Sequence, residues 1–149
     1  PEVQFYFNSL VEMLIELNSE SIVHRDIRLE TLYLDSRLTL KLGDFGESCL
    51  YKNERRKSLL KLTHYTSPEV INQSGHGFET DLWAVGAVVY TLLTGQEPFK
   101  SGESFSLGRI RNANFSFPSD LTLDYKWKEI LKRILVVDPS KRISLEQLR

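Results

Sequence analysis

Residues 21–48 read SIVHRDIRLETLYLDSRLTLKLGDFGES, and this stretch decides the fold class of the chain. His24-Arg25-Asp26 stands just after the short apolar run Ile22-Val23. Asp44-Phe45-Gly46 follows a segment, 38–42, whose leucines alternate as they do in a strand. Either tripeptide alone is a weak signal, because short motifs also occur by chance. In this order and at this spacing, the two together are specific.

A helical pattern flanks this stretch on each side. Over residues 2–19, apolar side chains recur at helical spacing, at Phe7, Leu10, Val11, Leu14 and Leu17. Residues 80–93 are apolar on nearly every side, which predicts a buried helix. Thr80 or Asp81 is expected to cap the start of that helix, and Gly95 is expected to end it.

The rest of the chain divides into an irregular segment and further helices. Residues 47–66 are polar and without periodicity, which indicates a functional or disordered loop. Two helical patches are expected near 103–112 and 123–136. Ser144 with Gln147 three residues later predicts a capping box for a last helix.

The composition is that of one globular domain. Of the 149 residues, 41% are hydrophobic and 26% are charged. The net charge of −1 argues against a nucleic-acid or membrane binder, and no apolar run reaches the roughly 20 residues of a membrane span. Cys49 is the only cysteine, which excludes an internal disulfide and suits a reducing compartment. Because the chain starts at Pro1-Glu2-Val3-Gln4 and stops at Leu148-Arg149 inside an apparent helix, we expect truncation at both ends.

Three later motifs belong with the first two. Ser67-Pro68-Glu69 closes the irregular loop, Asp81-Leu82-Trp83 opens the buried helix, and Arg142 follows Asp138-Pro139. With this set of motifs the whole chain resembles the protein kinase family, with Ser67 where the family has alanine.

The resemblance implies that residues 1–149 form the C-terminal lobe of a protein kinase domain. That lobe is mainly α-helical, with a few short β-strands beneath the nucleotide cleft. The N-terminal lobe is absent, since the sequence has no Gly-rich loop, no strand lysine and no glutamate partner for it. Half of the ATP cleft is therefore expected to lie outside this chain.

The resemblance also implies roles for individual residues. Phosphoryl transfer depends mostly on positioning and charge neutralisation, so the acceptor hydroxyl needs a carboxylate that orients it and takes its proton. By resemblance that carboxylate is Asp26, and Arg28 stands where the family has a catalytic-loop lysine. Asp44 matches the carboxylate that binds Mg2+, Thr31 stands at the second metal ligand, and Tyr33 supplies an aromatic surface for adenine. The alternative for the two aspartates is that they are ordinary turn residues.

Other residues are expected to support the loops. Arg25 is placed by resemblance to pair with a phosphate on Ser58. Asp81 is expected to hydrogen-bond the catalytic-loop backbone, or to serve only as a helix cap. Glu69 and Arg142 match a long-range ion pair, the alternative being two solvated surface charges.

Further residues narrow the resemblance to polo-like kinases, which act on serine and threonine. They are Leu29, Tyr33, Gly43 and the segments 56–59, 75–81 and 90–93. Tyr33 and residues 90–93 also have the plain alternative of being core residues.

Three departures from the family pattern count against ordinary activity. Thr31 replaces an asparagine, and its hydroxyl reaches less far than an amide carbonyl. Arg28 keeps the charge of lysine but is a planar fork. Lys61-Leu62 replace a Gly-Thr pair whose threonine bonds the catalytic aspartate, and Thr63 is shifted by one residue.

Functions of different classes therefore stay open. The first is a polo-like serine/threonine kinase domain that transfers the γ-phosphate of ATP to proteins, with ATP and Mg2+ as cofactors that need the missing lobe for normal binding. Activity of the fragment alone is not expected. The second is a pseudokinase lobe that acts as an interaction or regulatory module, and the third is a non-functional relic. The partner is a protein substrate or regulatory protein, without nucleic acid or membrane. The expected location is intracellular, in cytoplasm or nucleus, with the centrosome implied by resemblance alone.

Overall fold

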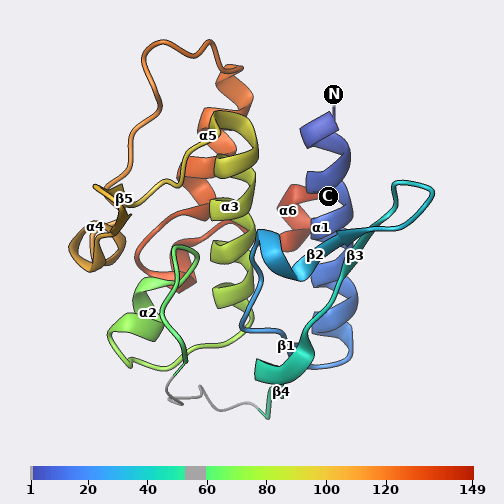
Figure 1. Cartoon of the computed structure of the whole chain (residues 1–149). Coiled ribbons are helices and arrows are strands. Elements are labelled where there is room, and N and C mark those ends of the chain that lie inside the picture. Colours follow the sequence, from blue (N-terminus) through green and yellow to red (C-terminus); the bar gives the residue numbers. More distant parts are fainter. Residues whose placement is uncertain (1, 53–59) are drawn as a thin grey trace.

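A central helix organises the structure. The computed structural model describes residues 2–52 and 60–149, and in it helix α3 (Phe78–Thr94) runs between the other helices (Figure 1). Every residue from 80 to 90 is buried, and Trp83, Val85 and Val88 expose no surface at all. A helix that is apolar all round is stable only when it is covered on all sides. The buried helix predicted over 80–93 is therefore confirmed.

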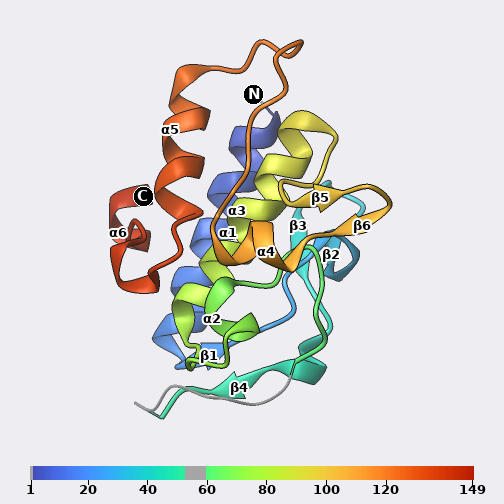
Figure 2. The ribbon, with the colours of Figure 1, turned by 90° about the vertical axis from the view of Figure 1, so that its left-hand side faces the viewer.

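Two longer helices flank α3. Helix α1 (Glu2–Ser19) packs along it through the predicted apolar stripe, of which Phe7, Leu10, Val11 and Leu14 are each 2% exposed. Helix α5 (Tyr125–Ile134) packs against α3 with Leu131 and Ile134 fully buried (Figures 1 and 2). Both apolar faces meet in one core, which also contains a stacked pair of rings, Trp83 and Phe99, with centroids 5.3 Å apart.

The strands are short and pair only as antiparallel couples in the described part of the chain. β1 (Ile22–Val23) pairs with β4 (Cys49–Leu50), and β5 (Lys100–Ser101) pairs with β6 (Ser104–Phe105). β2 (Leu32–Leu34) and β3 (Leu40–Leu42) form a hairpin in which Leu32 lies opposite Leu42. The strand expected over 38–42 begins only at Leu40, because Leu38 has a φ of 61° and belongs to the turn.

The remaining elements are single turns. They are the 3₁₀ turns η1 (Leu29–Thr31), η2 (Phe45–Glu47) and η3 (Pro139–Lys141), and the short helices α2 (Pro68–Ile71), α4 (Leu107–Arg111) and α6 (Leu145–Leu148). The patch predicted near 103–112 is thus divided between β6 and α4, whereas the patch near 123–136 is α5.

The ends of α3 show one correct and one wrong prediction. Gly95 follows the helix with a φ of 69°, as expected for a glycine that ends a helix. The helix begins at Phe78, after Gly77, so neither Thr80 nor Asp81 caps it. Both side chains bond to segments elsewhere in the sequence, and those contacts build the site described below.

The capping box at the last helix is confirmed. The hydroxyl of Ser144 accepts the N–H of Gln147 at 3.3 Å, and the side-chain oxygen of Gln147 accepts the N–H of Ser144 at 3.1 Å. Among residues 2–52 and 60–149, no helix combines the length and the apolar character that crossing a bilayer would require.

Candidate active site

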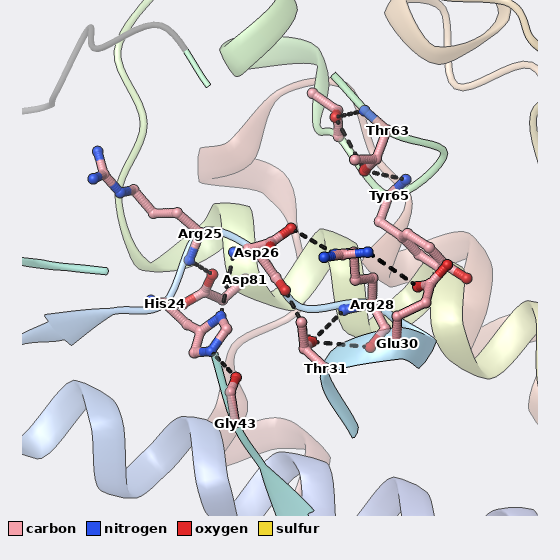
Figure 3. A network of polar contacts seen from close by, with 11 residues as sticks. His24, Arg25, Asp26, Arg28, Glu30, Thr31, Gly43, Thr63, Tyr65 and Asp81 are labelled. Atoms are coloured by element: carbon pink, nitrogen blue, oxygen red, sulfur yellow. Dashed lines mark hydrogen bonds and ion pairs between the residues drawn. The ribbon is translucent and has the colours of Figure 1, made fainter. Parts of the chain in front are cut away.

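The site is built around the buried carboxylate of Asp81, which is 1% exposed. Its Oδ2 accepts the N–H of His24 at 2.7 Å, and its Oδ1 accepts the N–H of Arg25 at 2.8 Å (Figure 3). Arg25 has a φ of 68°, a conformation that costs free energy in any residue but glycine. The two bonds from α3 therefore hold the loop in a shape that it would not adopt alone. Burial raises the pKa of Asp81 to about 6.

His24 connects the two loops that carry the sequence motifs. Its Nε2 lies 2.9 Å from the carbonyl oxygen of Gly43, and its Nδ1 accepts the N–H of Asp26 at 3.2 Å. The tautomer that satisfies both contacts carries its proton on Nε2, and burial lowers the pKa of the ring. The ring also meets Phe45 edge-on, with the two ring centroids 4.7 Å apart. His24 therefore links the backbone of Asp26 to that of Gly43, the residue before Asp44.

Asp26 carries a partly exposed carboxylate with a cation beside it. Arg28 Nε lies 3.0 Å from Asp26 Oδ1, and the two side chains are 28% and 21% exposed. The other end of the guanidinium lies 3.7 Å from Glu30 Oε2. A solvent-accessible carboxylate can receive a proton, and the adjacent guanidinium can neutralise negative charge that arrives there.

Asp44 is exposed on the turn between β3 and η2, with a φ of 57°. Across residues 2–52 and 60–149, no three His, Cys, Asp or Glu side chains gather into a group that could hold a metal by themselves. Mg2+ commonly keeps several waters and is bound by one or two carboxylates together with phosphate oxygens. An exposed single carboxylate at Asp44 fits that kind of site.

Whereas Asp44 is exposed, the other predicted metal ligand, Thr31, is buried. The residue is 1% exposed, and its hydroxyl lies 2.9 Å from the carbonyl oxygen of Asp26 and 3.0 Å from that of Arg28. The same oxygen accepts the N–H of Arg28 at 3.2 Å. The hydroxyl is thus surrounded by the backbone of its own loop.

Tyr33 lies on β2 and is 54% exposed. A Cβ atom on Gly43, the residue after β3, would come within 2.8 Å of the Tyr33 ring, so a side chain there would require the ring to shift. Sequence reasoning placed Tyr33 in the site and used Gly43 only to narrow the resemblance, and it did not predict that the two lie so close together.

Arg25 reaches two neighbours that are distant in sequence. Its Nε donates to the carbonyl oxygen of Glu47 at 2.5 Å, and its Nη1 lies 3.5 Å from Nε2 of His76. His76, which lies between α2 and α3, is 2% exposed. The predicted phosphate acceptor, Ser58, lies outside the described residues, so the pairing of Arg25 with it stays a prediction.

The segment before Ser67 has Leu62 where the family has a threonine, and Thr63 follows it. Leu62 is 40% exposed, and the hydroxyl of Thr63 accepts the N–H of Tyr65 at 3.2 Å. Nδ1 of His64 lies 2.9 Å from Oε2 of Glu97, beyond the end of α3, without the alignment of a hydrogen bond. No local sequence signal could have identified that pair, since 33 residues separate its members.

Glu69 and Arg142 form a buried two-pronged ion pair. Their atoms meet at 2.6 Å (Nη2 to Oε2) and 2.7 Å (Nη1 to Oε1), and the side chains are 3% and 1% exposed. Thr80 donates its hydroxyl to Glu69 Oε1 at 3.0 Å, and the guanidinium lies over the ring of Trp83 at 4.9 Å. Burial alone would raise the pKa of Glu69, but the hydrogen bonds and charge of Arg142 hold it below its ordinary value. The alternative of two solvated charges is therefore excluded.

These features define a class of protein. Residues 1–149 match the family model described as "Protein kinase domain", and the chain belongs to that family. Within it, the chain is 37% identical over its full length to serine/threonine-protein kinase plk-1 of Caenorhabditis elegans. It is 35% identical over 99% of its length to cell cycle serine/threonine-protein kinase CDC5/MSD2 of Saccharomyces cerevisiae. It is 36% identical, again over 99%, to serine/threonine-protein kinase PLK2 of Mus musculus. The chain therefore resembles polo-like kinases, and it spans 22–23% of the length of these three relatives.

Proposed function

We propose that residues 1–149 are the C-terminal lobe of a polo-like serine/threonine protein kinase, which transfers the γ-phosphate of ATP to serine or threonine of a protein substrate. The names of the relatives support the activity. The lobe assignment is supported by the helical body and by exposed apolar side chains on the β2–β3 hairpin and η2. These are Tyr33, Leu34, Leu38 and Phe45, exposed by 45% in Phe45 to 64% in Leu38. Such a group of side chains is typical of a surface that another part of a protein covers.

The observation that carries the proposal is the link from Asp81 through His24 to both loops. Asp81 fixes the backbone of His24 and Arg25. The ring of His24 in turn contacts the N–H of Asp26 and the carbonyl oxygen of Gly43. This arrangement orients Asp26 as the carboxylate that positions the acceptor hydroxyl and takes its proton. Pre-organised positioning of this kind supplies much of the rate of phosphoryl transfer.

The other site residues receive roles consistent with their geometry. Arg28 keeps a positive charge next to Asp26. Asp44 would hold Mg2+, which neutralises charge on the transferred phosphoryl group. The exposed ring of Tyr33 offers a surface for the adenine of ATP. ATP and Mg2+ are the cofactors that membership of the family implies.

Two further contacts brace the site. The Glu69–Arg142 pair anchors the segment after the irregular loop to the body of the lobe. Arg25 is proposed to meet a phosphate on Ser58. The pseudokinase alternative is not favoured, since the relatives named above are all named as serine/threonine-protein kinases.

The test is phosphate transfer by the protein that contains this chain, compared with its Asp26→Ala variant. We expect phosphorylated serine or threonine in a protein substrate with ATP and Mg2+, and none with Asp26→Ala. A contaminating kinase would survive the substitution, so the variant is also the control. Transfer at equal rates in both proteins, or no transfer in the unaltered protein, would contradict the proposal.

A further inference from the structure

The hydroxyl of Thr31 contacts the backbone of Asp26 and Arg28 in its own loop. These contacts close residues 26–31 into a hydrogen-bonded ring, called the ring below. Thr31 ends η1, and its Oγ1 contacts the carbonyl oxygens of Asp26 and Arg28 as well as the N–H of Arg28 (Figure 3). The backbone adds a fourth contact, in which the N–H of Thr31 donates to the carbonyl oxygen of Arg28 at 3.0 Å. One side chain thus holds both the start and the middle of the segment that carries the Asp26 carboxylate.

The ring leaves little of the hydroxyl for a metal ion. A hydroxyl offers one hydrogen and two lone pairs. Here the hydrogen faces two carbonyl oxygens, and one lone pair accepts the N–H of Arg28. The residue is 1% exposed, whereas Mg2+ demands near-octahedral oxygen ligands at about 2.0–2.1 Å and sheds its waters reluctantly. Coordination through Thr31 would therefore require the ring to open.

The charge beside the ring also disfavours a second cation. Arg28 Nε lies 3.0 Å from the Asp26 carboxylate, so a guanidinium already neutralises the nearest acidic group. Arg28 keeps this charge permanently, because desolvation of its guanidinium is outweighed by the hydrogen bond and negative charge of Asp26, which raise its pKa. The residues present at Thr31 do not fit a metal site, in contrast to the exposed carboxylate of Asp44.

We propose that Thr31 is a positioning residue rather than a metal ligand: its hydroxyl fixes the backbone of Asp26 and Arg28, and the site holds only the ion that Asp44 binds. This inference rests on the proposed kinase function. It replaces the expectation that Thr31 is the second metal ligand.

The first experiment uses this chain alone and follows amide hydrogen exchange. Thr31→Val keeps the shape of the side chain but removes the acceptor of the Arg28 N–H, so we expect that amide to exchange about 10-fold faster. The amides of His24 and Arg25, which bond to Asp81, are expected to keep their rates. Thr31→Ser, which keeps a hydroxyl, is expected to restore slow exchange at Arg28.

A matched control separates the ring from a general effect of losing a hydroxyl. Thr91 donates its hydroxyl to the carbonyl oxygen of Ala87 within α3. Thr91→Val makes the same chemical change there, and we expect no effect on the Arg28 amide. Unchanged exchange at Arg28 in Thr31→Val would overturn the proposal. If Thr31→Val fails to fold, a fast Arg28 amide in folded Thr31→Ser would overturn it equally.

The second experiment counts metal ions in the protein that contains this chain. With a non-hydrolysable ATP analogue and Mn2+ as the paramagnetic probe, we expect one bound ion in both the unaltered protein and Thr31→Val. Two ions that fall to one in Thr31→Val would show Thr31 to be a ligand and contradict the proposal. This count needs no turnover, so it decides the role of Thr31 even if the protein transfers no phosphate.

Where transfer occurs, kinetics give a third readout. Because Thr31→Val loosens Asp26 without removing a metal contact, we expect kcat to fall about 10-fold while KM for MgATP stays within about twofold. Thr31→Ser is expected to recover kcat. A raised KM for MgATP with unchanged kcat would instead indicate lost metal or nucleotide binding and overturn the proposal.

Discussion

His24 fits its surroundings only as a neutral ring with its proton on Nε2. A proton on Nδ1 would face the N–H of Asp26, which that nitrogen accepts at 3.2 Å. Nε2 is already committed to the carbonyl oxygen of Gly43. The burial of the ring lowers its pKa, and the geometry favours the same neutral form. Protonation of His24 at Nδ1 would therefore break its contact with the N–H of Asp26.

The lowered pKa of His24 predicts a loss of stability at low pH. Because its ordinary pKa is 6.5, the stabilisation that the neutral ring provides is fully present above pH 6.5 and is lost as pH falls through the lower folded-state pKa. Thermal unfolding between pH 7.5 and 5.5 is expected to show this loss in the unaltered chain and not in His24→Phe. At pH 7.5, His24→Phe is expected to cost about 2 kcal/mol, for two hydrogen bonds.

Asp81 changes the stability with pH in the direction opposite to His24. The pH dependence of the unaltered chain must therefore be compared with that of His24→Phe. Burial raises its pKa to about 6, and the stability that this shift contributes is present below pH 3.8 and is lost as pH rises through 6. That contribution is common to both proteins and cancels in their difference. An identical pH dependence in the chain and in His24→Phe would contradict the assignment of the neutral tautomer.

The site residues that could be predicted from the sequence are those that stand in motifs of consecutive residues. Asp26, Asp44 and Asp81 each stand in a recognisable tripeptide, so the amino-acid pattern alone was enough to expect them in one site. The contacts of Arg25 with Glu47 and His76 could not be expected, since they span 22 and 51 residues and depend on how the loops fold back. The enclosure of the Thr31 hydroxyl was likewise invisible, because it depends on the turn η1.

At the scale of elements, close packing of helices decides more than helix propensity does. The apolar pattern of α3 predicted its burial but not its start, because the helix begins directly after Gly77, ahead of the predicted caps, and leaves Asp81 free to bond the loop. The pattern also gave no indication of the distance to α5. At Gly86, an added Cβ would lie 2.5 Å from a methyl group of Ile134 and 3.1 Å from Leu135.

Gly86→Ala is therefore expected to destabilise the chain. Alanine is better in a helix by about 1 kcal/mol, but overpacking against α5 costs typically about 1–3 kcal/mol, so we expect a net loss in urea unfolding. Gly108→Ala in α4 is the matched control, since the nearest atom to its added Cβ, Ser106 Oγ, is 3.8 Å away. That variant is expected to be neutral or slightly more stable. Equal effects at both glycines would show that the α3–α5 contact is looser than described.

The Glu69–Arg142 pair connects elements that are 73 residues apart. Arg142 Nη1 also donates to the carbonyl oxygen of Glu79 at 2.8 Å, so one guanidinium joins the end of the irregular loop to α3. Removing one member leaves the other charge buried, so Arg142→Met is expected to cost about 3–5 kcal/mol in urea unfolding.

The exposed pair of Lys132 with Glu129 serves as the control for Arg142. These side chains are 59% and 42% exposed, and Lys132→Met is expected to cost less than about 1 kcal/mol. The pKa of Glu69 adds a pH signature. Because it lies below the ordinary 4.5, its contribution is present above that pH and is lost as pH falls. A loss in Arg142→Met no larger than in Lys132→Met would refute the anchoring role.

At the scale of the whole molecule, the core and the proposed nucleotide site differ in how far their side chains are covered. The helices of the described residues enclose a continuous core around α3. The face that carries Tyr33 and Phe45, by contrast, leaves both residues about half exposed. The sequence contains the motifs of the loops beneath a kinase cleft but no Gly-rich loop or strand lysine, and the proposed C-terminal lobe would account for both facts.

The most direct test of the central claim is a calorimetric titration of this 149-residue chain with MgATP, after its folding has been checked by thermal unfolding. Because we propose that the chain is a kinase C-terminal lobe, we expect it to unfold in one cooperative transition and to show no saturable binding up to about millimolar MgATP, where a dissociation constant corresponds to about −4 kcal/mol. Saturable binding at micromolar concentration, which needs about −8 kcal/mol, would contradict the claim that half of the nucleotide site lies outside these residues.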